Sequence, residues 1–178
     1  MKRLAGAMAF VSAVLVLVIA VVPGGWLGRV ERAQAQGFMN TPKDNFNLVS
    51  LYIQVNQFGK ATDLLYAGLK SGAIENDAKN WVYLGYYYLQ INRNQDALTV
   101  LKEATKLFPN NGQFDLQIGE IYRQEEKMKE ARIHYREALR RGGLDRPYAV
   151  HTLLANVSYE LEDFDKAMKS ISQAEALS

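Results

Sequence analysis

Four alanines recur at nearly constant intervals along this chain and constrain its fold more than any other feature. They are Ala61, Ala97, Ala131 and Ala167, and they are separated by 36, 34 and 36 residues. The segments around them align as four copies, and apolar residues within each copy recur every three or four positions, which is the helical period. No segment beyond Phe38 alternates with the period of a strand. The pattern predicts a stack of helical hairpins.

Each copy contains two helical segments of about a dozen residues. The stretch "WVYLGYYYLQ" at 81–90 places Trp81, Leu84, Gly85 and Tyr88 on one helix face, so we expect these four in the core. Tyr87 is expected to lean toward the preceding repeat. Two helices cross closely only where side chains are tiny, and the residues expected at such crossings are Gly85, Gly119, Ala97, Ala131 and Ala167. Helix ends are expected at Thr41 and Pro42, at Gly72, at Pro109 and at Gly142.

The second copy carries a longer signature, which resembles the tetratricopeptide repeat family. That family has a 34-residue helix-turn-helix period, and the matching residues here are Trp81, Leu84, Gly85, Tyr88, Ala97, Leu101, Ala104 and Pro109. Asn45, Asp115 and His151 stand where Trp81 does in the other copies. The resemblance covers residues 42–178 and implies an all-α, right-handed superhelical solenoid of eight helices. The four repeats are expected at about 42–77, 78–111, 112–147 and 148–178.

The amino-terminal segment reads as an export signal. Lys2 and Arg3 precede an apolar run from 4 to 22, and small residues near Ala35 predict cleavage after that position. The alternative is a retained inner-membrane tether through residues 4–28, because the hydrophobic stretch is long enough to span a bilayer. Both interpretations place the repeats in the periplasm or outside the cell. Residues 1–35 are therefore expected to be the signal or anchor, and 36–41 a short linker.

Beyond that segment the charges nearly balance. Residues 36–178 contain 17 basic and 18 acidic side chains, so no global positive field for nucleic acid remains. The chain has no cysteine, which excludes disulfides and a lipidated amino-terminal cysteine.

A partner-binding groove is the candidate site. In the resembling family the concave surface is lined by the first helix of each repeat, and the corresponding stripe is amphipathic. Tyrosine, glutamine and asparagine suit a peptide backbone or an amphipathic helix, because they combine apolar area with hydrogen-bonding groups. An idle polar surface is the alternative interpretation. The predicted groove residues are Lys43, Phe46, Asn47, Ser50, Lys79, Val82, Tyr83, Tyr86, Leu89, Gln90, Gln113, Gln117, Glu120, Arg123, Asn156 and Tyr159.

The family resemblance also says what kind of partner to expect. Cytosolic relatives that grip chaperone tails use a basic cluster in the groove, and this carboxylate clamp is absent, since the matching residues are Phe46, Ser50, Tyr83, Gln113 and Gln117. The segments 61–104 and 142–167, including the "GGLDRP" link, resemble envelope repeat proteins that accompany TonB, ExbB and ExbD systems. That resemblance implies a periplasmic adaptor near the inner membrane.

No catalytic set emerges from the sequence. His134 and His151 have no cysteine, paired histidine or suitably spaced acid, so we expect no enzyme, no metal site and no cofactor. The leading hypothesis is a non-enzymatic scaffold that binds a partner peptide or helix in the groove. The alternative is a self-assembling protein whose repeats build a homo-oligomeric scaffold.

Overall fold

The computed structural model describes residue 25 and residues 27–38 and 41–177. In this part of the chain all regular structure is helical. Most of the predicted export signal lies outside the described residues. The described helices are α2 (Leu27–Ala35), α3 (Pro42–Gln54), α4 (Phe58–Ser71), α5 (Ala78–Gln90), α6 (Asn94–Leu107), α7 (Gln113–Gln124), α8 (Met128–Arg141), α9 (Pro147–Glu160) and α10 (Phe164–Glu175).

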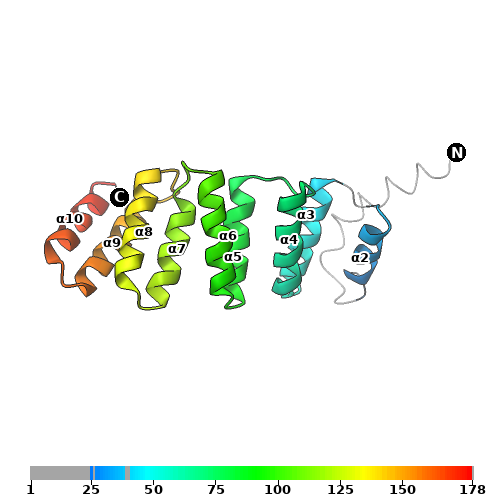
Figure 1. Ribbon diagram of the computed structural model, residues 1–178, viewed down its shortest axis with the longest axis horizontal. Helices are drawn as coiled ribbons and strands as arrows, with labels where there is room; N and C mark the ends of the chain where they lie inside the picture. The colour runs from blue at the N-terminus through cyan, green and yellow to red at the C-terminus, as the bar shows by residue number, and fades with distance from the viewer. Residues whose placement is uncertain (1–24, 26, 39–40, 178) are drawn as a thin grey trace.

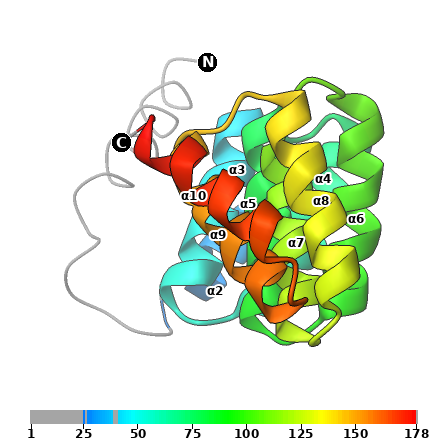
Figure 2. The same cartoon turned by 90° about the vertical axis from the view of Figure 1, so that its left-hand side faces the viewer.

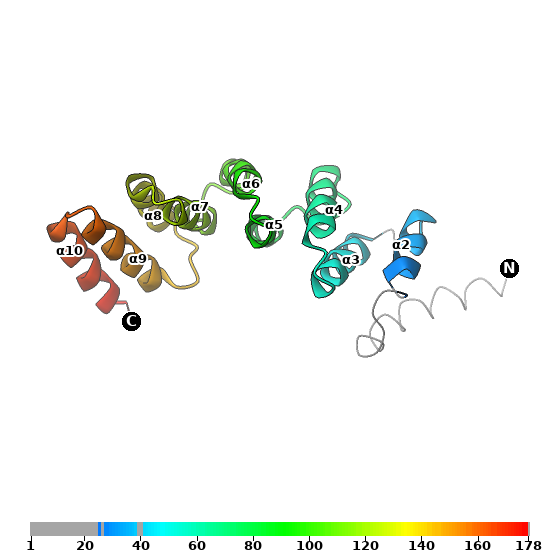
Figure 3. The same ribbon diagram turned by 90° about the horizontal axis from the view of Figure 1, so that it is seen from below.

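The helices from α3 to α10 form four antiparallel pairs that stack along one axis (Figure 1). This arrangement confirms the eight helices and the solenoid expected from the sequence. Viewed along the stack, α4, α6 and α8 gather on one side (Figure 2). Viewed from below, the array curves, and α3, α5, α7 and α9 line the inside of the curve (Figure 3). The first helix of each repeat therefore lies on the concave side, as the family resemblance implied.

The helix ends follow from local sequence. The Thr41 side chain accepts a hydrogen bond from the Asp44 amide at 3.1 Å, and the Thr41 backbone N–H donates to the Asp44 carboxylate at 3.4 Å. With Pro42 in the first turn this is a capping box, so the predicted start of α3 is confirmed. Gly72 ends α4 in the left-handed conformation, with φ of 78°.

Small residues occupy the helix crossings, as predicted. A Cβ atom built on Gly85 would lie 2.5 Å from Gln117 Oε1 and 2.6 Å from Leu101 Cδ2. At Gly119 it would lie 2.6 Å from the Tyr135 ring. These separations are below van der Waals contact, so neither position accepts a side chain without displacing its neighbours.

The core residues of the second repeat are buried as expected. Trp81, Leu84 and Tyr88 are all nearly inaccessible to solvent. The Trp81 indole donates to Asn76 Oδ1 at 2.7 Å, and its ring meets Tyr66 of the preceding repeat edge-on at 6.3 Å. Trp81 thus contacts both the loop before α5 and helix α4 of the preceding repeat.

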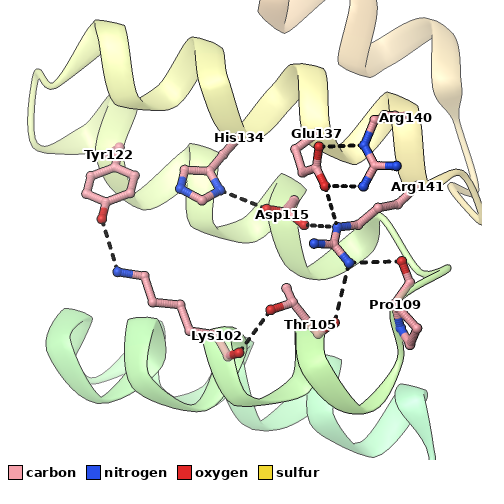
Figure 4. Close-up of polar contacts among 9 residues, drawn as sticks. All are labelled: Lys102, Thr105, Pro109, Asp115, Tyr122, His134, Glu137, Arg140 and Arg141. Carbon is pink, nitrogen blue, oxygen red and sulfur yellow. Dashed lines mark hydrogen bonds and ion pairs between the residues drawn. The ribbon is translucent and has the colours of Figure 1, made fainter.

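Asp115, at the position of Trp81 in the third repeat, joins α7 to α8, and its partner Arg141 reaches the Thr105 carbonyl of α6 at 3.4 Å (Figure 4). Its carboxylate is buried and lies 2.8 Å from His134 Nδ1 and 2.8 Å from Arg141 Nε. Arg141 Nε and Asp115 Oδ2 form an ion pair, but their geometry is not that of a hydrogen bond. Arg141 also donates to the carbonyl of Pro109 at 2.9 Å and contacts Glu137 at 3.0 Å. A charged network therefore replaces the consensus tryptophan and links the second and third repeats.

The turn within each repeat has a feature that the periodicity does not reveal. One residue in each turn adopts a left-handed conformation, with φ between 56° and 59°. Asparagine tolerates this region better than most residues, whereas glutamate is strained there. The four residues are Asn56, Asn92, Glu126 and Glu162, at equivalent positions of the four repeats.

Candidate protein-binding surface

Five aromatic rings form a connected cluster on and beside α5, which we name the tyrosine platform. Tyr83 stacks on Tyr87 with ring centroids 6.0 Å apart, and Tyr86 meets Tyr87 edge-on at 5.8 Å. Phe46 of α3 approaches Tyr83, and Phe58 of α4 approaches Tyr87, each at 6.3 Å. The cluster therefore bridges the first and second repeats, and contacts on several sides hold its rings in place.

Exposure differs sharply within the platform. Tyr86 is 50% exposed, Tyr83 is half-buried, and neighbouring Tyr88 is only 4% exposed. Burial, followed by the nearby Tyr83 and Tyr86, raises the pKa of Tyr87 above its ordinary value. Its contact with Phe58 confirms that it leans toward the preceding repeat. The platform thus combines four partly buried rings with one exposed ring, that of Tyr86.

A cation borders the tyrosine platform. Lys79 Nζ lies 5.7 Å from the centroid of the Tyr83 ring, within the range of a cation–π interaction. Lys79 is exposed. The ammonium lies over the ring, so a ligand that contacts Tyr83 would meet an aromatic surface next to a positive charge.

Gln117 of α7 contacts α5 from the side of the third repeat. Its side-chain amide donates to the Val82 carbonyl at 3.1 Å, joining α7 to α5. Its Oε1 atom is buried and has no hydrogen-bond partner within the structure. This oxygen sits against Gly85, which explains in part why that glycine has no space for a side chain.

Further along α7 the polar residues of the predicted groove are already paired. Glu120 accepts hydrogen bonds from Arg123 Nη2 at 2.8 Å and from the Tyr135 hydroxyl at 2.6 Å. Burial and this bond raise the pKa of Tyr135 well above its usual range. The hydrogen bond that Arg123 donates to Glu120 is the largest cause of the raised Arg123 pKa. Glu120 and Arg123 therefore support the surface more than they offer free charges.

All sixteen predicted groove residues lie at the surface or partly buried. Ser50 is half-buried and directs its hydroxyl to the Phe46 carbonyl of its own helix at 3.1 Å. Tyr159 of α9 is exposed, and its ring meets Phe164 at 5.4 Å. The exposed members are Lys43, Lys79, Tyr86, Gln90, Asn156 and Tyr159, and the partly buried ones are Phe46, Asn47, Ser50, Val82, Tyr83, Leu89, Gln113, Gln117, Glu120 and Arg123. We call the surface formed by these residues the inner face.

Two contacts in the structure were not expected from the sequence: the one between His134 and Asp115, and the one between Phe58 and the tyrosine platform. The statement that His134 has no suitably spaced acid is wrong, because Asp115 on the neighbouring helix contacts its ring. Asp115 is buried and shared with Arg141, so we assign the pair to holding repeats together. Phe58 was not assigned to the surface either, although its ring supports the platform. The feature of the sequence that could have indicated this contact is the position of Phe58 at the start of the second helix of its repeat.

Among the described residues, 25, 27–38 and 41–177, no helix combines the length and the apolarity needed to cross a membrane. Within the same residues, no three or more His, Cys, Asp or Glu side chains are grouped so that they could hold a metal ion.

Comparison with known proteins identifies the repeat type. Residues 83–146 match the tetratricopeptide repeat family model. The Protein CTR9 homolog of Arabidopsis thaliana is 28% identical over 93 residues, which is 51% of this chain but only 8% of that protein. This chain therefore spans a small part of that relative's length.

Solved structures share the fold over most of the chain. MamA from Desulfovibrio magneticus RS-1, beginning at its residue 41, superposes with a TM-score of 0.62 at 15% identity, covering 88% of this chain and 97% of that one. A crystal structure of MamA gives 0.67 at 16% identity over 85% and 86% of the chains. A thermophilic TPR protein from Thermus thermophilus gives 0.57 at 18% identity over 85% and 81%. Residues 83–146 therefore match the tetratricopeptide repeat model, and the solved structures share the solenoid fold of paired helices over most of the chain.

Proposed function

We propose that this protein is a non-enzymatic scaffold that binds a partner peptide or helix on the inner face, centred on the tyrosine platform. The observation that carries the proposal is the exposure of Tyr86 and the partial exposure of Tyr83 beside rings that are held in place by packing. A tyrosine offers large apolar area and a polar tip while losing little conformational freedom. Rings already held in place therefore make suitable anchors for a partner.

The chemistry of the surface favours an amphipathic partner over a highly charged one. Glu120 and Arg123 neutralise each other, so the inner face has little net charge near α7. Lys79 is the exposed charge next to the platform. We propose a helix or extended segment that places an apolar or aromatic side chain on Tyr83 and Tyr86 and an acidic group near Lys79.

We further propose that the scaffold works in the bacterial cell envelope. Support comes from Lys2 and Arg3 followed by the apolar run, which favour export or an inner-membrane tether. Resemblance to the repeat proteins of TonB, ExbB and ExbD systems suggests an adaptor of such an energy-transduction system. Fractionation of cells tests the location, and recovery of the protein from the cytoplasm would contradict it.

Site-specific crosslinking tests where the partner binds. A photo-crosslinkable phenylalanine analogue at Tyr86 should capture a defined protein in intact cells. The matched control carries the same analogue at Thr99, an exposed residue of α6 on the outer layer, and should not capture that protein. Capture from Thr99 but not from Tyr86 would move the binding site to the outer layer.

A further inference from the structure

The carboxyl-terminal end of the solenoid exposes an apolar face of α10. Phe164, Met168 and Ile171 are spaced by four and three residues, so they lie on one side of the helix. Their exposed fractions are 55%, 63% and 41%. The ring of Tyr159 touches Phe164 and extends the same apolar surface.

The other repeats show what normally covers this face. Counting from the regular spacing of Ala61, Ala97, Ala131 and Ala167, Ile171 is equivalent to residues that are fully buried in the three earlier repeats, namely Leu65, Leu101 and Tyr135. Phe164 is equivalent to Phe58, whose ring contacts Tyr87 of the next repeat. Leu101 and Tyr135 pack against the first helix of their own repeat, at Gly85 and Gly119. The second helices α4, α6 and α8 also contact the first helix of the following repeat, which is α5, α7 and α9 respectively. The α10 face is therefore shaped to receive a first helix.

The opposite end of the solenoid is covered differently. Val30 of α2 is buried in a core shared with α3. The Tyr52 hydroxyl donates to Glu31 at 2.7 Å, and Gln34 donates to Asn45 at 3.0 Å. In Figure 3, α2 lies on the side of α3 away from α5.

Equivalent contacts show which position α2 occupies. Tyr122, the counterpart of Tyr52 in the third repeat, accepts a hydrogen bond at 3.3 Å from Lys102 on the preceding second helix, α6. Trp81, the counterpart of Asn45, meets Tyr66 on the preceding second helix, α4. The short helix α2 thus fills the place that a preceding second helix would take against α3.

We propose that copies of this chain stack head to tail, with the α10 face of one copy packing against α3 of the next, and that α2 blocks this contact while it is docked. The two surfaces correspond in register. Leu51 of α3 is equivalent to Tyr87, and Phe164 of α10 is equivalent to Phe58, so the Phe58–Tyr87 contact would recur between copies as Phe164–Leu51. A second copy supplies a first helix in the correct register, which is why we choose it as the occupant.

Such a contact joins two different surfaces, so it leads to open chains of copies and not to closed dimers. The predicted cleavage after Ala35 would remove α2 and leave both ends free, whereas a retained amino terminus would keep the block. The stacking uses the ends of the solenoid and leaves the tyrosine platform open. It therefore goes beyond the proposed partner binding and can fail independently of it.

Disulfide trapping tests the proposal in the full chain, because the natural sequence has no cysteine. Leu51→Cys and Phe164→Cys are introduced together, with and without Val30→Asp, which places a charge in the buried contact of α2. After oxidation in detergent, the Val30→Asp chain should give a ladder of covalent multimers, at least about tenfold stronger than the chain with Val30 intact. Glu31→Ala, which removes only the polar contacts of α2, should shift the ladder in the same direction.

The controls separate the alternatives. Leu51→Cys with Thr99→Cys places the second thiol on an exposed position of α6 away from the stacking face, and should give no ladder. Circular dichroism must show that each variant remains helical. The proposal is overturned if the folded Val30→Asp and Glu31→Ala chains give no ladder. It is also overturned if the ladder is equally strong with and without these two substitutions. Dimers formed by Phe164→Cys alone, in place of the ladder, would show a two-fold contact and also overturn it.

Discussion

Replacing Asp115 by asparagine should destabilise the solenoid more than any comparable change at an exposed acid. The substitution keeps the shape of the side chain and removes its charge. Asp115 is 4% exposed at its side chain and faces both His134 and Arg141. Removing one partner of a buried ion pair typically costs about 3–5 kcal/mol, because the other charge is left without compensation.

The remaining contacts of Arg141 reduce that cost. Its guanidinium keeps Glu137 at 3.0 Å and the Pro109 carbonyl at 2.9 Å. We therefore expect the lower end of the range, about 3 kcal/mol. For a chain of this size each kcal/mol lowers the melting temperature by about 2–4 °C, so the expected decrease is about 6–12 °C.

Urea denaturation followed by circular dichroism measures the effect, with Asp96→Asn as the matched control. Asp96 pairs with Arg93, and both side chains are nearly half-exposed, so its loss should cost less than about 1 kcal/mol. A double-mutant cycle between Asp115→Asn and Arg141→Met should show that the two losses are not additive. If Asp115→Asn costs no more than Asp96→Asn, the network does not hold the repeats together.

Three further variants test other parts of the fold. Glu126→Asn should stabilise the protein by about 0.5–1 kcal/mol in urea denaturation, because asparagine tolerates the left-handed turn better; a loss of stability would contradict this. Gly119→Leu should cost about 1–3 kcal/mol or more, since its side chain would enter the Tyr135 ring, and an unchanged melting temperature would refute the close crossing. Burial and the bond to Glu31 raise the pKa of Tyr52 to about 12 from 10.0, so stability present below pH 10 should be lost as the pH rises through that interval. Tyr52→Phe should make this alkaline loss shallower in urea denaturation at successive pH values; an unchanged slope would count against the contact with α2.

The repeat and its core could be predicted from the sequence because the same pattern of small and apolar residues recurs in four copies. The alanine spacing fixes the hairpin length, and Trp81, Leu84 and Tyr88 follow from the helical period. The exposure of Tyr86 follows from the same helical period. The cap at Thr41 and Pro42 depends on neighbouring residues alone, so it too could be predicted.

The Asp115 network and the docking of α2 could not be predicted, because they depend on contacts between residues that are far apart in the sequence. Asp115, His134 and Arg141 lie on two helices and meet only after these pack, so the network was invisible in the sequence. The helix at Leu27–Ala35 adjoins the apolar amino-terminal stretch and has no counterpart in the repeat. Its docking on α3 depends on Val30 and Glu31, two residues without a distinctive spacing.

The central claim is that a protein partner binds the tyrosine platform, and titration of the captured partner tests it most directly. Binding is compared for the natural chain, for Tyr83→Ala/Tyr86→Ala and for the control Ile133→Ala/Tyr148→Ala, which removes exposed apolar side chains of α8 and the start of α9. Truncating aromatic anchors often costs about 2 kcal/mol or more, so we expect the platform variant to lose more than about tenfold in affinity while remaining folded. The control should bind like the natural chain. Equal affinity of the folded platform variant and the natural chain would contradict the account.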